Sequence, residues 1–306
     1  SKTGYKFGVP VLLVFLLVGM LLGVDGLGIQ FDNYKYAQII GMVALTIILF
    51  SGGMDTKFKD IKPILGPGVV LSTIGVLLTT LFTGVFIYVR SHAFSHVIQI
   101  PLTFAFLLAA TMSSTDSASV FNILRSQKMG LRNKLQPMLE FESGSNDPMA
   151  YILTIVLIQL ALTVDVSSGA DIDFAVLFVD TLKILVQQFA AGAMIGLFAG
   201  YGTVWFMKKV NIDNMPLYSI MLISIVFFTY AFSDLLDGNG YLAVYITGII
   251  VGNNKMKNRK QVSAFFDGMT WIVQIAMFLL LGLLVNPSEM WKTALAALFI
   301  GVFMMI

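Results

Sequence analysis

The sequence of 306 residues contains no cysteine, only two histidines and few charged side chains. Without cysteine the chain has neither a disulfide framework nor a thiolate metal site. Charged residues make up 12% of the sequence, whereas a soluble domain has about 25%. The net charge of only +2 gives no indication of a nucleic-acid partner. The scarcity of charge argues against water-soluble domains and leaves a lipid bilayer as the expected solvent.

Long apolar runs are abundant instead. Hydrophobic residues make up 57% of the sequence, and the mean hydropathy is +0.86. Because about 20 apolar residues suffice for one transmembrane helix, the sequence predicts an all-α polytopic membrane protein with one transmembrane domain over residues 1–306. Span 172–207 exceeds a perpendicular crossing, so its start is expected to lie along the membrane interface. The ten predicted spans are 8–24, 36–52, 67–89, 101–127, 136–162, 172–207, 216–234, 240–253, 262–285 and 291–306.

The loops that join these spans alternate in charge. Most of the 19 basic residues fall in loops on one side of the predicted bundle, whereas the loops on the other side carry mainly acidic residues. By the positive-inside rule, the basic side faces the cytoplasm. Residue 1 is then cytoplasmic, and span 101–127 crosses once despite a polar interruption.

Three glycines recur at a fixed separation of 229 residues. The pairs are Gly19 with Gly248, Gly23 with Gly252 and Gly53 with Gly282. The loop charges make span 8–24 run outward and span 240–253 run inward, which is the arrangement of an inverted-topology repeat in secondary transporters. Adding the same offset to the acidic residues of spans 101–127 and 136–162 gives positions beyond 306. The repeat partners of these two spans are therefore missing, which predicts that the chain is a truncated form of a larger bundle.

Two polar clusters interrupt otherwise apolar spans. The first is Ser113–Ser119 around Asp116, and the second is Glu142–Pro148. An ionisable side chain near the bilayer centre costs at least about 2.5 kcal/mol, so carboxylates there indicate an ion or proton pathway. Small hydroxyl side chains satisfy backbone groups freed where a membrane helix unwinds, so the first cluster predicts a helix broken near Thr115 and Asp116. An intact helix with small residues at a packing interface is the alternative.

The second cluster predicts a polar stripe along one side of a helix. Asn146 follows Glu142 by four residues, and Asp147 follows Ser143 by the same interval. A structural carboxylate at membrane depth would need a cationic partner, and the sequence places no Lys or Arg clearly in mid-span. Asp147 is therefore expected to titrate, so that a proton and a cation compete for it.

These clusters carry a resemblance to a known family. The motifs concerned are Thr115-Asp116, Glu142-Ser143-x-x-Asn146-Asp147, Phe50–Asp55 and Gly238–Ala243. In this order they resemble the motifs of NhaP-type antiporters, the electroneutral branch of the monovalent cation:proton antiporters, and particularly of its potassium/proton members. The resemblance implies an inverted-repeat antiporter fold with a helix broken near the membrane centre.

The resemblance also implies a role for each residue of the clusters. Asp147 would bind the monovalent cation and exchange it for a proton, while Ser143 and Thr115 supply further oxygen ligands. Asp116 would lie at the helix crossover. Asn146 stands where electrogenic relatives carry a second aspartate, which implies one exchanging carboxylate and therefore electroneutral, one-for-one exchange.

Further implications concern the whole protein. The resemblance favours potassium over sodium, and it implies a homodimer in the inner membrane of a bacterium, without a cofactor. In the family Glu142 forms an ion pair with an arginine on a later helix, and no such residue follows before position 306. The family has one more span before Ser1, so the chain is expected to be truncated at both ends.

Two other functions also place aspartates in a membrane bundle. A cation channel would need a continuous pore rather than an inverted repeat around a midplane site. An intramembrane aspartyl protease carries its second aspartate after a Gly-x-Gly pattern, whereas Asp147 follows Ser145-Asn146. A transporter is therefore expected rather than an enzyme. His92 and His96 are spaced for a shared metal but have no third ligand nearby in the sequence, and they are predicted to be solvated loop residues.

Overall fold

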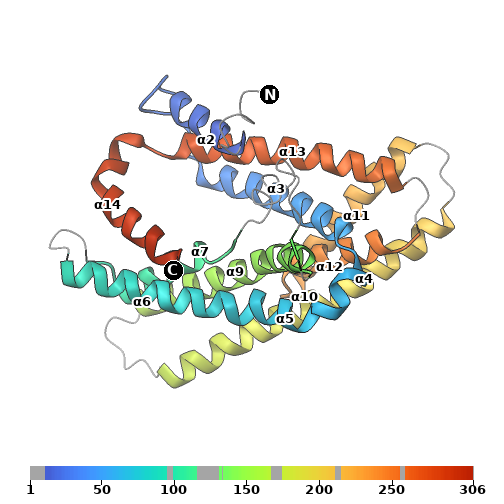
Figure 1. The fold of residues 1–306 in the computed structure, drawn as a ribbon, viewed down its shortest axis with the longest axis horizontal. Helices are drawn as coiled ribbons and strands as arrows, with labels where there is room; N and C mark the ends of the chain where they lie inside the picture. The colour runs from blue at the N-terminus through green and yellow to red at the C-terminus, as the bar shows by residue number, and fades with distance from the viewer. Residues whose placement is uncertain are drawn as a thin grey trace.

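The computed structural model describes residues 11–94, 99–115, 131–132, 134–166, 174–210, 215–255 and 259–305. This part of the chain is almost entirely helical and contains no strand (Figure 1). The elements are α2 (Val11–Leu22), α3 (Tyr34–Asp55), α4 (Phe58–Ile61), η1 (Lys62–Ile64), α5 (Leu65–Val70), η2 (Leu71–Gly75), α6 (Val76–Phe94), α7 (Leu102–Thr111), α9 (Leu135–Val166), α10 (Phe174–Lys209), α11 (Met215–Leu235), α12 (Gly240–Asn253), α13 (Arg259–Leu284) and α14 (Pro287–Met304).

Six helical stretches of the described chain are long and apolar enough to cross a membrane, and α2, α7 and α12 are shorter apolar helices. Many large apolar side chains point outward, such as Phe198, which is 79% exposed. Outward apolar side chains are unfavourable in water but not in hydrocarbon. The described helices therefore form a multi-pass membrane bundle, while the number of its crossings stays a prediction.

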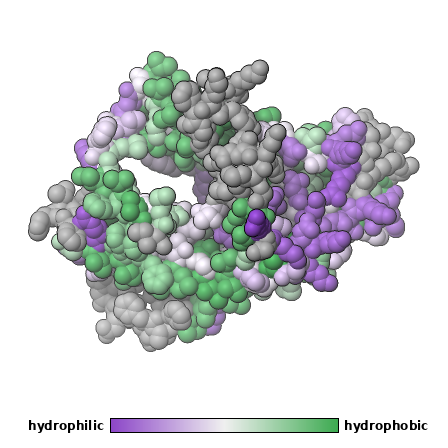
Figure 2. Space-filling view, in the orientation of Figure 1, coloured by the Kyte–Doolittle hydropathy of each residue, from purple (hydrophilic) through white to green (hydrophobic). Residues whose placement is uncertain are grey.

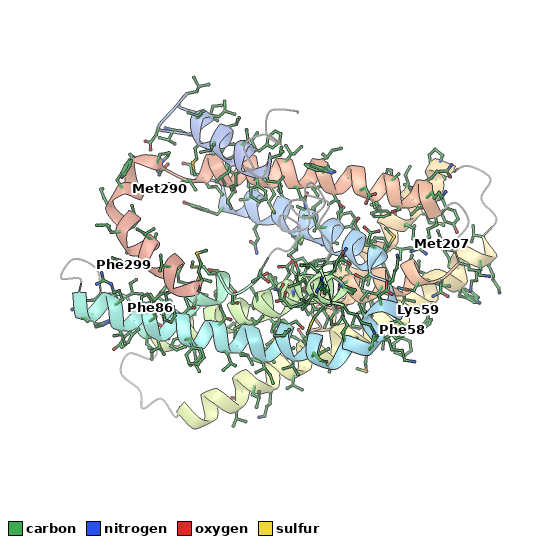
Figure 3. All side chains as sticks on the ribbon, in the orientation of Figure 1. Phe58, Lys59, Phe86, Met207, Met290 and Phe299 are labelled. Carbon is green, nitrogen blue, oxygen red and sulfur yellow. The ribbon has the colours of Figure 1, made fainter. Side chains whose placement is uncertain are left out.

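Basic side chains gather at one end of the bundle, called the basic end below. Lys59 on α4 and Met207 near the end of α10 both lie at this end (Figure 3). Figure 2 shows a hydrophilic surface over this end and a more hydrophobic surface over the rest. The other basic residues of the end are Lys57, Lys62, Lys208, Lys209, Lys255, Arg259 and Lys260. This clustering agrees with the predicted alternation of the loops.

Two pairs of helices cross at glycines. On α3 and α12, Gly53 faces Gly248, and on α13 and α2, Gly282 faces Gly19. A Cβ atom would lie 2.5 Å from a backbone oxygen of the facing helix at the first two glycines, and 2.2 Å from one at the other two. Any side chain would push the helices apart, so both crossings require glycine.

The two crossings are related by the 229-residue offset. Gly53 faces the carbonyl oxygen of Tyr245. Its repeat mate Gly282 faces that of Leu16, which stands 229 positions before Tyr245. The other equivalent contacts are Gly248 with Phe50 and Gly19 with Leu279, and Gly252 with Met54 and Gly23 with Leu283. Since α3 ends at the basic end and α13 begins there, the two copies run in opposite directions, which confirms the predicted inverted repeat.

Helix α12 occupies the middle of the bundle. It packs between α3 and α10, and its polar Thr247 donates to the Gly196 carbonyl oxygen of α10 at 3.1 Å. Gly196 allows this approach because a Cβ there would lie 2.7 Å from the Ala243 carbonyl oxygen. The other side of α12 meets α9, where Gly144 accommodates the ring of Tyr245. Helix α12 thus joins the repeat to the helix that carries the second polar cluster.

Two of the predicted spans correspond to long helical stretches. The predicted span 67–89 is part of a longer helical stretch, Phe58–Ala93, which contains a π-helical turn at η2. Helix α10 is one continuous helix that runs diagonally across the bundle (Figure 1), and the interfacial position of its start stays a prediction. A tilted helix accommodates the extra length without a bend.

Candidate functional site

Helix α7 ends inside the first polar cluster. Its last residue is Thr111, and Ser113, Ser114 and Thr115 are not helical. The Ser113 hydroxyl donates to the Ala110 carbonyl oxygen at 2.7 Å, and the Ser113 N–H donates to the same oxygen at 3.2 Å, so this acceptor at the helix end is satisfied locally. The predicted break is confirmed and begins at Met112, earlier than expected. Asp116 lies outside the described residues.

Helix α9 carries the second cluster and continues through Pro148. Proline has no N–H group, so the carbonyl oxygen of Gly144 lacks its usual partner within the helix. Gly144 also lacks a side chain, and a Cβ there would lie 2.7 Å from the Tyr245 ring. On the opposite side of this turn, Asn146 is fully buried. The cluster therefore lies between α12 and the broken end of α7.

Four side chains tie the end of α7 to α9. Ser143 Oγ donates to the Thr115 carbonyl oxygen at 3.0 Å. Asn146 Nδ2 donates to Thr115 Oγ1 at 2.8 Å and to Glu142 Oε1 at 2.9 Å. Thr115 Oγ1 in turn donates to Glu142 Oε1 at 3.2 Å. Hydrogen bonds to α9 thus hold Thr115 in place beyond the end of α7.

Asp147 accepts a hydrogen bond from the Ser114 hydroxyl. The same hydroxyl lies 3.2 Å from Asn146 Oδ1, so Ser114 connects both residues to the α7 end. Ser114 was not among the predicted site residues. Its position directly before Thr115, inside the hydroxyl-rich run, is the one signal in the sequence that points to it.

The structure thus brings together five of the six predicted site residues. Thr115, Glu142, Ser143, Asn146 and Asp147 share one hydrogen-bonded network with Ser114. The network offers carboxylate, hydroxyl and backbone carbonyl oxygens, which are the donors that hard cations accept. The resemblance implied an arginine partner for Glu142. In the hydrogen bonds described here, Thr115 and Asn146 contact its carboxylate instead, and none of these contacts involves a cationic side chain.

The histidines are not part of this site. His92 is in the last turn of α6 and is exposed, and its Nδ1 lies 2.9 Å from the Tyr88 carbonyl oxygen. It is therefore helical rather than in a loop, although solvated as expected, and His96 lies outside the described residues. Within the described ranges, no three His, Asp or Glu side chains are placed to hold a metal ion.

A broken helix thus faces a carboxylate-bearing helix beside an inverted repeat. Residues 3–306 match the family described as "Sodium/hydrogen exchanger, transmembrane". The chain belongs to this family. The family match extends over nearly the whole sequence.

Curated relatives agree with this membership. The exchanger chain is 39% identical over 306 residues to the K(+)/H(+) antiporter NhaP2 of Shewanella sp. (strain ANA-3), covering 98% of this chain and 50% of that protein. It is 37% identical over 297 residues to the K(+)/H(+) antiporter NhaP of Alkalimonas amylolytica, covering 97% and 49%. The chain thus spans about half the length of these relatives.

A more distant relative and a solved structure extend the comparison. The Na(+)/H(+) antiporter NhaH of Halobacillus dabanensis is 26% identical over 314 residues, covering 95% of the exchanger chain and 72% of that protein. The sodium proton antiporter MjNhaP1 of Methanocaldococcus jannaschii superposes with a TM-score of 0.78 at 21% identity, covering 99% of this chain and 73% of the other. This likeness confirms the predicted all-α antiporter fold.

Proposed function

We propose that the protein containing this chain exchanges a monovalent cation for a proton across the membrane, and that Asp147 is the exchanging carboxylate. The observation that carries the proposal is the hydrogen bond from Ser114, on the unwound end of α7, to Asp147 in the interior of α9. A carboxylate at membrane depth is energetically costly, so its presence there indicates an ion or proton pathway. Membership of the exchanger family supports the same conclusion.

The exchange rests on competition for one carboxylate. Ionised Asp147 attracts the cation, and oxygens of Thr115 and Ser143 complete its ligand set. The proton neutralises Asp147 and removes the attraction, so the two cargoes exclude each other. Ser114 is a hydroxyl and can donate to the ionised carboxylate or accept from the protonated one, so it serves both states.

The stoichiometry follows from Asn146. Its amide donates to Thr115 and Glu142, which an aspartate cannot do, so position 146 supplies no second carboxylate for exchange. One proton is then traded for one monovalent cation, and transport is electroneutral. Relatives named as K(+)/H(+) antiporters at 37–39% identity favour potassium, with sodium as the alternative that the more distant NhaH suggests.

The remaining features of the proposal concern the setting. The protein is a homodimer in the inner membrane of a bacterium, with the basic end on the cytoplasmic side, as the positive-inside rule favours. Neither a cation channel nor an intramembrane aspartyl protease is supported, because an exchanger family covers the chain and the site adjoins an inverted repeat.

The replacement Asp147→Asn tests the proposal in the whole protein that contains this chain. Reconstituted in proteoliposomes, the variant should lose cation-dependent proton movement, measured with a pH-sensitive dye inside the vesicles. Asp180→Asn is the matched control, because Asp180 is exposed and contacts Lys183 at 3.1 Å. Exchange at the wild-type rate in Asp147→Asn would refute the assignment.

A further inference from the structure

The motif Gly238–Ala243 places the turn between α11 and α12 beside the exchange site. The buried Asn239 caps α12 by accepting from the Leu242 N–H at 2.7 Å. Its backbone N–H donates to the Gln188 carbonyl oxygen at 2.9 Å, and its Nδ2 lies 3.4 Å from the Pro148 carbonyl oxygen. The turn thus packs against the interior parts of α9 and α10, beside Pro148, the residue after Asp147.

This placement brings together the rings of three tyrosines. The ring of buried Tyr241 lies edge-on to Tyr151 of α9, with centroids 4.6 Å apart. It also packs on Tyr230 of α11, with centroids 5.0 Å apart. Gly240 makes room for this contact, since a Cβ there would lie 2.7 Å from the Tyr230 ring. The rings of Tyr151, Tyr241 and Tyr230 thus form one contiguous cluster.

Each end of this cluster continues to a carboxylate. Asp234 follows Tyr230 by one helical turn on α11, is exposed, and acts electrostatically on all three tyrosines. At the other end, Asp147 precedes Tyr151 by one turn on α9. We call Asp234, Tyr230, Tyr241 and Tyr151 the tyrosine row. The row leads from solvent, at the end of α11 away from the basic end, to the exchanging carboxylate.

We propose that the tyrosine row conducts protons between the external solution and Asp147. The proposal rests on the antiport function above. A phenol accepts a proton on its oxygen and releases its own to the next acceptor, so one proton moves along the row without a charged tyrosine accumulating. Asp234 takes the proton from water, and Asp147 receives it. Because the rings are in contact, the row has no space for a hydrated cation, which takes a different route.

The test separates proton transfer from cation binding in the whole reconstituted protein. Cation/proton exchange is followed by an internal pH dye, and exchange of labelled for unlabelled potassium is followed at symmetrical pH, where no net proton moves. Tyr230→Phe keeps the ring and removes only the hydroxyl. Tyr218→Phe is the matched control on the same helix, because Tyr218 is buried and its hydroxyl donates to the Met207 carbonyl oxygen at the basic end, at 3.4 Å.

Tyr230→Phe should slow cation/proton exchange by at least about tenfold, since a positioned proton-transfer group contributes about 10²-fold or more. Potassium/potassium exchange should stay at the wild-type rate, and Asp234→Asn should show the same selective loss. Unchanged cation/proton exchange in Tyr230→Phe would overturn the proposal. Equal slowing of both exchanges would also overturn it, because the hydroxyl would then be structural. A wild-type protein without cation/proton exchange would refute the proposed function itself.

Discussion

At the scale of residues, Asn146 fixes both the shape and the charge of the site. Its side chain is fully buried, and its amide donates to Thr115 on the α7 end and to Glu142 on its own helix. An aspartate at this position would have no donor, and its carboxylate would face that of Glu142. The amide therefore docks the unwound segment and keeps the negative charge of the site low.

Asn146→Asp is expected to destabilise the protein by about 1–3 kcal/mol, the usual cost of leaving buried polar groups unsatisfied. The thermal unfolding midpoint of the purified protein should fall accordingly. Asn254→Asp is the matched control, because its amide donates to the Ile250 carbonyl oxygen at the end of α12, away from the site. Adding Glu142→Gln to Asn146→Asp should recover part of the loss, since it removes one of two facing carboxylates. Purely additive losses would contradict this explanation.

At the scale of elements, the glycine crossings determine how closely the repeat halves approach. Gly52 and Gly53 are neighbours on α3, yet a Cβ at Gly53 would lie 2.5 Å from the Tyr245 carbonyl oxygen, whereas one at Gly52 meets nothing within 4 Å. The obstacle at Gly53 is backbone, which cannot turn aside as a side chain can. The crossing therefore has no tolerance for a methyl group.

Gly53→Ala is expected to cost about 1–3 kcal/mol, the usual penalty for overpacking a close contact. Gly52→Ala is the control, and it should leave stability unchanged or slightly raised, because alanine favours helix more than glycine does. Thermal unfolding in detergent measures both. The repeat mate Gly282→Ala should resemble Gly53→Ala, and a stable Gly282→Ala variant would show that only one crossing is constrained.

A loop outside the spans caps α14. Asp25 Oδ2 accepts from the Ser288 N–H at 2.7 Å, while the N-cap residue Asn286 makes no side-chain capping bond. The hydrogen bond from the Ser288 backbone lowers the pKa of Asp25 below the ordinary value of 3.8. The ionised carboxylate therefore stabilises the start of α14 at neutral pH.

The sign of the pH dependence follows from that shift. Because the folded pKa is lowered, the contribution of Asp25 is present above pH 3.8 and is lost as pH falls through the folded pKa. Asp25→Ala should lower the thermal unfolding midpoint at pH 6, and the difference from wild type should shrink toward pH 3. Asp32→Ala, in the same loop, is the control. A difference that is constant with pH would mean that the charge of Asp25 does not matter.

At the scale of the whole molecule, the two copies of the repeat meet in the interior and the site adjoins their crossing. Glycines place α12 against α3, and α12 in turn contacts α9 at Gly144. In the proposed function, Asp147 on α9 is the one residue of the site that exchanges a cation for a proton. A molecule that moves one positive charge inward for each one outward carries no net current.

Electroneutral exchange is therefore expected of the whole protein in proteoliposomes. A membrane potential, imposed with an ionophore that does not carry potassium, should not change the rate of cation/proton exchange at a fixed pH difference. Exchange by an electrogenic antiporter under the same protocol serves as the control. Cation uptake that follows the imposed potential would rule out one-for-one exchange at Asp147.

Composition and residue order were enough to predict the solvent, the fold class and most of the candidate site. Composition alone indicates lipid, and equal spacing of glycines such as Gly53 and Gly282 reveals the repeat, because a repeated contact needs the same small residue at both places. Asp147 and Asn146 could be identified because polar residues are conspicuous in apolar spans. These features depend on the order of residues along one chain.

Only the tertiary structure decided which groups meet. Lipid and protein interior are both apolar, so the hydrophobic pattern of a membrane helix does not show which side faces the bundle. For that reason the sequence did not predict Ser114 as the donor to Asp147, or the contact of Tyr241 with Tyr151 and Tyr230. The break also begins at Met112 rather than at Thr115.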